Sequence, residues 1–138
     1  MYLEDCIPKD KFDHDAVKRA SEIGYPGINA ILPDLLVWLQ DRTWPVAPDV
    51  ARLLERAGTG IAPHISAILN SRDSQWKYGV LIELGPSLDG DVWRLIEVDV
   101  IRLIDAPTKQ DISDEVHTMA AEVFQNRVAD GQSATMDD

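Results

Sequence analysis

Apolar residues recur along most of the chain at the three- and four-residue spacing of one helix face. Two such runs, Leu32–Leu39 and Ile61–Leu69, each lead into the motif Asp-x-x-Trp, at Asp41 and again at Asp73. A further helical run follows each motif: Val50, Leu53, Leu54 and Ala57 after the first, and Trp76, Val80, Leu81 and Leu84 after the second. Because the motifs are 32 residues apart, the pattern predicts a repeat of two-helix units.

The same spacing, with its stop and start signals, gives the boundaries of roughly seven helices. They are expected over residues 13–23, 33–40, 48–58, 61–69, 74–84, 93–104 and 113–127, with a short helical piece over residues 28–31. Val17, Ala20 and Ile23 are expected to face inward from the first helix, which Gly24 ends. Pro33 suits the first turn of its helix, and Ser113 is placed to cap the last one.

Residues 93–104 allow two interpretations. Ile96-Glu97-Val98-Asp99-Val100 alternates with the period of a strand, whereas Trp93, Ile96, Val100 and Leu103 share one helix face. The rest of the chain contains no second convincing strand for pairing. We therefore expect a helix here.

The chain is expected to form one domain between two terminal segments. Residues 1–12 are interpreted as a lead, residues 13–128 as the helical domain and residues 129–138 as a disordered acidic tail. The tail has too little apolar surface to become ordered. The expected fold is all-α, with about three stacked helical hairpins.

A family resemblance agrees with this fold. The stretch Leu32-Pro33-Asp34-Leu35-Leu36-Val37-Trp38-Leu39-Gln40-Asp41, followed by Trp44-Pro45-Val46-Ala47, resembles the hallmark of a family of small bacterial domains of unknown function. Ile7-Pro8-Lys9-Asp10 and Trp76-Lys77-Tyr78 are similar as well, so the likeness covers roughly residues 7–125, with Arg42-Thr43 as a departure. It implies a short α-solenoid of HEAT-like repeats and leaves the activity open.

Composition narrows the class of protein. The chain has no apolar stretch long enough to span a membrane, no signal-peptide pattern at its start and a single cysteine, Cys6, which together favour the reducing cytoplasm. The net charge is −11, and most of it lies in residues 83–138, where 13 acids face 4 bases. Such a charge repels nucleic acid and attracts basic partners.

No catalytic or metal-binding signature is present. His14, His64 and His117 lie on separate predicted helices without the spacing of metal ligands. The glycine pairs read as helix ends and starts rather than as phosphate-binding loops. We therefore expect no enzyme activity, no cofactor and no metal.

The tryptophans and their aspartates are assigned mainly to structure. Trp44 and Trp76, with Asp41, Pro45 and Asp73, hold matching or adjacent repeat positions and are expected to fill and brace the turns. Trp38 and Trp93 stay open between a buried and an exposed position, and an exposed tryptophan would suit partner binding.

The function hypothesis is a monomeric, non-enzymatic protein-binding module. In its sharper form it is a bacterial immunity-type protein that covers a basic toxin domain. The expected contact residues are Asp89, Asp91, Glu97, Asp99, Asp105 and Trp93, with Asp111, Asp114 and Glu115 adding charge. The alternatives are an enzyme whose site the sequence hides, and a nucleic-acid-binding repeat that uses Lys18, Arg19, Arg52, Arg56, Arg72 and Lys77.

Overall fold

The computed structural model describes the backbone of residues 2–136 and the side chains of residues 2–130, and this part of the chain is helical with no strand. The α-helices are α1 (His14–Ile23), α2 (Leu32–Leu36), α3 (Ala47–Leu54), α4 (Ala62–Leu69), α5 (Ser74–Glu83), α6 (Gly90–Asp105), α7 (Lys109–Ser113) and α8 (Val116–Met136). Short 3-10 helices are η1 (Leu3–Cys6), η2 (Asn29–Ile31), η3 (Val37–Leu39), η4 (Thr59–Ile61) and η5 (Gly85–Ser87). The prediction of an all-α fold is confirmed.

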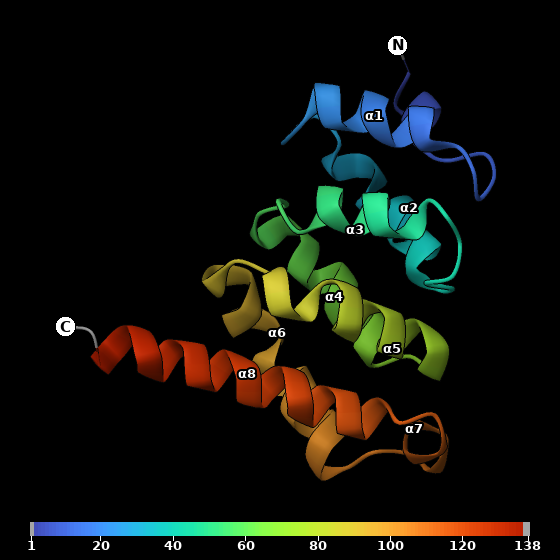
Figure 1. Cartoon of the computed structure of the whole chain (residues 1–138). Helices are drawn as coiled ribbons and strands as arrows, with labels where there is room; N and C mark the ends of the chain where they lie inside the picture. Colours follow the sequence, from blue (N-terminus) through green and yellow to red (C-terminus); the bar gives the residue numbers. More distant parts are fainter. Residues whose placement is uncertain (1, 137–138) are drawn as a thin grey trace.

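The helices are arranged in two rows that run from one end of the molecule to the other (Figure 1). One row contains α1, α3, α5 and α8, and the other contains α2, α4 and α6. Contacts between the rows pair α2 with α3, α4 with α5 and α6 with α8. The short helix η1, which belongs to neither row, packs on α1. Along the rows α1 contacts α3, α4 contacts α6, and α5 contacts α8. The core lies between the rows.

Residues 90–105 form one continuous helix, so the helical interpretation of the third unit is confirmed. Trp93, Ile96, Val100 and Leu103 are buried on one face of α6. Val98, between two of them in the alternating pattern, is 69% exposed. The period of the helix therefore decides which of these apolar residues enter the core.

The two Asp-x-x-Trp motifs differ in local structure. Asp73 is the N-cap of α5, and its carboxylate accepts a hydrogen bond from Trp76 N at 3.0 Å. Asp41 instead accepts from Thr43 N and Thr43 Oγ1 within a turn, and α3 begins only at Ala47. The second motif therefore starts a helix, whereas the first folds a loop that precedes one.

The helices before the motifs correspond more closely. Pro33 and Pro63 each lie in the first turn of an α-helix that directly follows a 3-10 turn, η2 in one case and η4 in the other. The first of these α-helices ends at Leu36 and continues as η3, while α4 continues to Leu69. The similarity of the two units is therefore greatest where each begins.

Trp76 joins α5 to the end of α2. Gln40 N donates to Val37 O in a 3-10 turn, so this amide does not make the α-helical bond to Leu36 O. Trp76 Nε1 donates to Leu36 O at 2.9 Å. One turn further along α5, a Cβ on Gly79 would lie 2.2 Å from Leu39 O. The indole and the glycine thus allow α5 to lie directly against the backbone of residues 36–39.

Several details of the helices and of the terminal segments differ from the sequence-based expectations. The lead belongs to the domain, because Cys6 is fully buried and η1 contacts α1. The helix α8 continues to Met136, into the segment interpreted as a tail; residues 137–138 lie outside the described part. Ser113 does not cap the last helix but ends α7, whose N-cap is Thr108. Ile23 is 39% exposed rather than inward, and α3 ends at Leu54, four residues earlier than expected.

We expect the indole N–H of Trp76 to add to the stability of the fold through its hydrogen bond. Trp44 makes no such bond within the described part of the chain and should contribute by packing alone. Trp76→Phe keeps most of the ring but removes the indole N–H that donates to Leu36 O, which should cost about 1–1.5 kcal/mol. Trp44 packs edge-on against Trp38, with ring centres 5.3 Å apart, and its indole N–H has no partner among the described residues. Trp44→Phe is the matched control and should cost less than about 1 kcal/mol. Both Trp→Ala variants should lose about 3 kcal/mol or more. Urea unfolding measures all four, and equal losses for the two Phe variants would contradict this assignment.

Candidate functional site

The residues around the start of α5 enclose a groove of about 440 Å³, which we call the α5 groove. It is lined by Gln40, Asp41, Arg42, Thr43, Gln75, Tyr78, Asp114 and Glu115. These residues come from the first motif's turn, from α5 and from the junction between α7 and α8. Three carboxylates and one guanidinium therefore face the same space, which gives the groove two excess negative charges at neutral pH.

Two of the three acids are fixed in the ionised form. The Thr43 hydroxyl and amide donate to Asp41, and these hydrogen bonds lower the pKa of Asp41 below its ordinary value. Ser74 Oγ and Gln110 Nε2 donate to Asp114 and lower its pKa in the same way. Hydrogen bonds to a carboxylate stabilise its charged form. The groove thus keeps these charges in mildly acidic solution.

Glu115 adds an unusual backbone conformation to the groove. Its φ is 62°, in the left-handed region that residues other than glycine rarely adopt. It lies in the short connection between α7 and α8, and its side chain is exposed. This turn places Asp114 and Glu115 at the rim of the groove, opposite the loop that carries Asp41.

A guanidinium already lies at the aromatic wall of the groove. The Arg42 guanidinium carbon is 5.7 Å from the centre of the half-buried Tyr78 ring. Positive groups are attracted to the negative face of an aromatic ring. The groove therefore combines the two features that hold an arginine or lysine side chain, carboxylates at the rim and an aromatic face.

A buried ion pair fixes the α7 side of the groove. Lys77 Nζ lies 2.9 Å from Asp111 Oδ1, and the two side chains are 4% and 2% exposed. Asp111 also forms a capping box with Thr108, in which each residue's side chain accepts from the other's backbone N–H. Burial alone would raise the pKa of Asp111, but hydrogen bonds from Lys77 and Thr108 outweigh it and hold the pKa below 3.8.

The predicted contact residues are spread over different environments. Asp89, Asp91 and Asp105 are exposed, and Glu97 is partly exposed. Asp99, by contrast, accepts hydrogen bonds from Ser66 Oγ at 2.6 Å and Asn70 Nδ2 at 2.9 Å, and joins α6 to α4. Asp99, expected as a contact residue, is therefore engaged between two helices, and Asp111, expected to add charge, is buried.

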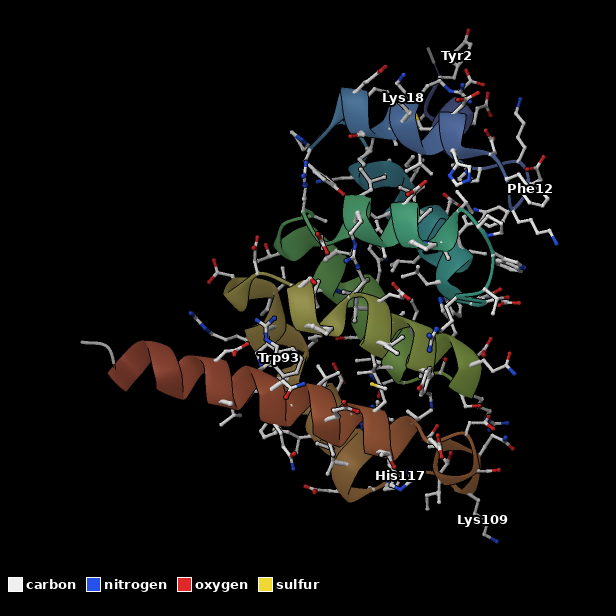
Figure 2. The ribbon with its side chains drawn as sticks, viewed as in Figure 1. Tyr2, Phe12, Lys18, Trp93, Lys109 and His117 are labelled. Atoms are coloured by element: carbon white, nitrogen blue, oxygen red, sulfur yellow. The ribbon has the colours of Figure 1, made fainter. Side chains whose placement is uncertain are left out.

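Trp93, which the sequence left open, is buried. It is 6% exposed and lies beside α8 (Figure 2), and the Arg127 guanidinium carbon is 4.9 Å from its ring centre. The Arg127 side chain also donates to the carbonyl oxygens of Gly85, Pro86 and Leu88. Trp93 is thus covered from within the chain and is not available as an exposed contact. Trp38 is partly buried against the core.

A second groove, of about 450 Å³, lies between α1 and α3. It is lined by His14, Asp15, Val17, Lys18, Ser21, Asp49, Arg52, Leu53 and Arg56. His14 Nδ1 lies 2.5 Å from Asp49 Oδ2 and links the two helices. The groove brings together three of the bases considered for nucleic-acid binding, Lys18, Arg52 and Arg56. Asp15 and Asp49 lie among them, and Arg52 is also close to Glu55 and Glu83.

The described residues show no cluster of metal ligands and no helix that could span a membrane. No group of three histidine, cysteine or acidic side chains within this part is placed to hold a metal ion. Burial raises the pKa of the Cys6 thiol, which therefore stays protonated at neutral pH. None of the described helices is both long and apolar enough to cross a membrane.

The sequence pattern of one family, described as a domain of unknown function (DUF5071), matches residues 6–124. The chain belongs to this family. The comparison with curated proteins gave no match. The DUF5071 match includes Cys6 and η1, in agreement with the burial of that segment, and it includes every residue of the α5 groove.

Sequence reasoning found part of this site. It named Asp41, Asp114 and Glu115, but for separate reasons, and it did not bring them together. It missed Tyr78 as the aromatic wall and Lys77 as the partner of Asp111. The spacing Thr108-x-x-Asp111 is a capping signature that indicates the start of α7. The ion pair spans 34 residues and leaves no local signal.

We expect the pair of Lys77 and Asp111 to be strongly coupled. Asp111→Asn leaves the Lys77 ammonium buried without its carboxylate, and Lys77→Met does the converse, so each should lose about 3–5 kcal/mol. The double variant should lose clearly less than the sum, because it leaves no unpaired charge. Urea unfolding of the four proteins measures the coupling, and additive losses would contradict it.

The same pair predicts a pH dependence. The pKa of Asp111 is lower in the folded chain than its ordinary value of 3.8. Its contribution is therefore fully present above about pH 4 and is lost as the pH falls through the lower folded-state value. The stability difference between the wild type and Asp111→Asn should shrink below pH 4 in urea unfolding curves. A difference that stays constant down to pH 2 would contradict the assignment.

Proposed function

We propose that this member of the DUF5071 family is a non-enzymatic module that binds a basic segment of another protein in the α5 groove. The observation that carries the proposal is the groove itself, which Asp41, Asp114 and Glu115 line together with Tyr78. Arginine side chains pair with carboxylates and stack on aromatic rings. Arg42 makes that stacking contact within the chain, and an arginine or lysine of a partner would make it from outside.

The architecture is also part of the proposal. We infer that the helix pairs stack as HEAT-like repeats, which is supported by the similar starts of α2 and α4 and by the paired rows in Figure 1. Stacked helical repeats commonly present an extended surface to another macromolecule. A bacterial immunity-type protein that neutralises a basic toxin in the cytoplasm is the most specific form of this idea. The net charge of −11 would attract such a partner.

Nucleic-acid binding is the second candidate, and its support is the groove between α1 and α3. Lys18, Arg52 and Arg56 line that groove together. Phosphate contacts of this kind give a strong salt dependence and are not selective for proteins. Its carboxylates, Asp15 and Asp49, would repel phosphates, so the α5 groove is the better-supported site.

Removal of two groove charges should weaken the capture of basic proteins. The groove variant is Asp41→Asn with Glu115→Gln, which leaves the Asp114 brace to Ser74 intact. Its matched control is Asp89→Asn with Asp91→Asn, an equal change in charge at two exposed residues outside the groove. In pull-downs from the native extract at low salt, basic proteins should bind to the wild type and to the control, and about tenfold less to the groove variant.

A third variant reports on the aromatic wall. Arg42→Ala frees Tyr78 and removes a positive charge, so it should increase the capture of the same basic proteins. Equal capture by all four proteins, or equal loss in the groove variant and its control, would contradict the proposal. Capture that a nuclease abolishes, and that Lys18→Ala with Arg56→Ala abolishes as well, would favour nucleic acid instead.

A further inference from the structure

The outward face of α6 carries exposed aliphatic side chains that no element of the described chain covers. Val98 is 69% exposed and Leu95 is 54% exposed, and Ile101 is partly exposed beside them. Buried residues occupy the opposite face of the same helix. Exposed aliphatic side chains grouped on one face are typical of a contact surface.

The residues of this face are arranged symmetrically about Val98. Leu95 and Ile101 lie three positions to either side, Arg94 and Arg102 lie four positions away, and Asp91 and Asp105 lie seven positions away. Residues at spacings of three, four and seven share one face of a helix. The face is therefore a palindrome in the order acid, base, apolar, apolar, apolar, base, acid.

The aliphatic centre of such a helix face can pack on the aliphatic centre of a second copy, and each end then brings the acid and base of one copy to the acid and base of the other. When two copies of such a helix pack in opposite directions about a two-fold axis, each residue meets the other half of the same pattern. We propose that the α6 face binds a second copy of this chain, with the two α6 helices antiparallel and the two Val98 side chains at the axis. The aliphatic residues of both copies then form the centre of the contact.

The charges favour this arrangement over random contact. With a rise of about 1.5 Å per residue, Arg102 lies about 6 Å from the axis, and Asp91 of the second copy lies about 10.5 Å from it on the same side. This offset of about 4.5 Å is measured along the helix axis only, and Arg94 of the second copy lies level with Arg102, as Asp91 of the second copy does with Asp105. Each end of the contact therefore gathers two arginines and two aspartates, whose charges sum to zero. Arg94 has the same offset from Asp105 of the second copy on the other side of the contact. The two-fold axis repeats both pairs.

Both arginines make weak contacts within the free chain. Arg102 Nη2 donates to Leu69 O at 3.4 Å and lies 3.9 Å from Asp99 Oδ1. Arg94 lies 3.6 Å from Asp91 within its own helix, and both side chains are more than three-quarters exposed. An exposed pair of this kind contributes at most about 1 kcal/mol, so exchanging it for a pair between copies costs little. The interface is one helix face, below the size of a permanent dimer, so we expect a dissociation constant on the order of 100 µM.

The dimer differs from the monomer that the sequence alone led us to expect, and it is independent of the α5 groove, none of whose residues lies on α6. Sedimentation equilibrium over a range of concentrations measures it directly. Val98→Lys should weaken self-association at least tenfold. Val128→Lys, at a 40% exposed valine of α8, is the matched control and should leave it unchanged.

Charge reversal gives a sharper test, because the two exposed residues Arg94 and Asp105 are expected to pair between copies. R94D places two acids together at both contacts of the dimer, and D105R places two bases together, so each variant alone should be monomeric. A mixture of R94D with D105R restores opposite charges at both contacts and should form a heterodimer with near wild-type affinity. Circular dichroism and thermal melting check that every variant keeps the fold.

Three results would overturn the proposal. A wild type that stays monomeric up to about 1 mM would do so, because this is ten times the expected constant. Self-association that Val98→Lys leaves unchanged would place the contact elsewhere. A mixture of R94D and D105R that stays monomeric while the wild type dimerises would exclude the antiparallel arrangement.

Discussion

The buried ion pair between Lys77 and Asp111 is the interaction on which the far end of the molecule depends. An ammonium and a carboxylate without water are stable only when each is paired and hydrogen-bonded. Lys77 lies in the middle of α5, and Asp111 belongs to the five-residue helix α7, which is too short to be stable alone. The pair and the capping box with Thr108 together fix α7 against α5. The direction in which α8 starts, and hence its contact with α5 and α6, follows from that position.

The same helix, α5, connects the two halves of the chain. On one side Trp76 donates to Leu36 O and Gly79 lies against Leu39 O. On the other side Lys77 holds α7. The α5 groove lies between these two attachments, with one rim from the turn at Asp41 and the other from Asp114 and Glu115. Its shape is therefore set by contacts between segments that are far apart in the sequence. Its negative charge comes from both halves of the chain, from Asp41 in the first and from Asp114 and Glu115 in the second.

What could be predicted from the sequence was local. The apolar stripe of α6 and the stop at Gly24 are each encoded within a few residues, and both were found. The role of Lys77 could not be found in this way, because its partner is 34 residues away and a lysine between two aromatic residues reads as exposed. Trp93 was left open because its cover, Arg127, comes from another helix. Nothing in the sequence distinguishes the surroundings of Asp99 and Asp111 from those of the exposed Asp91. Their side chains nevertheless bind residues of other helices and hold those helices together.

Hydrogen exchange at the amides of α7 tests most directly whether the ion pair holds this region in place. We expect amides in residues 109–113 to be protected in the wild type and to exchange at least about tenfold faster in Lys77→Met, because loss of the pair releases α7 by local unfolding. Amides in α1 and α3 should change little, since these helices lie at the other end of the molecule. Unchanged protection of α7 in Lys77→Met, or an equal loss of protection in all helices, would contradict the account.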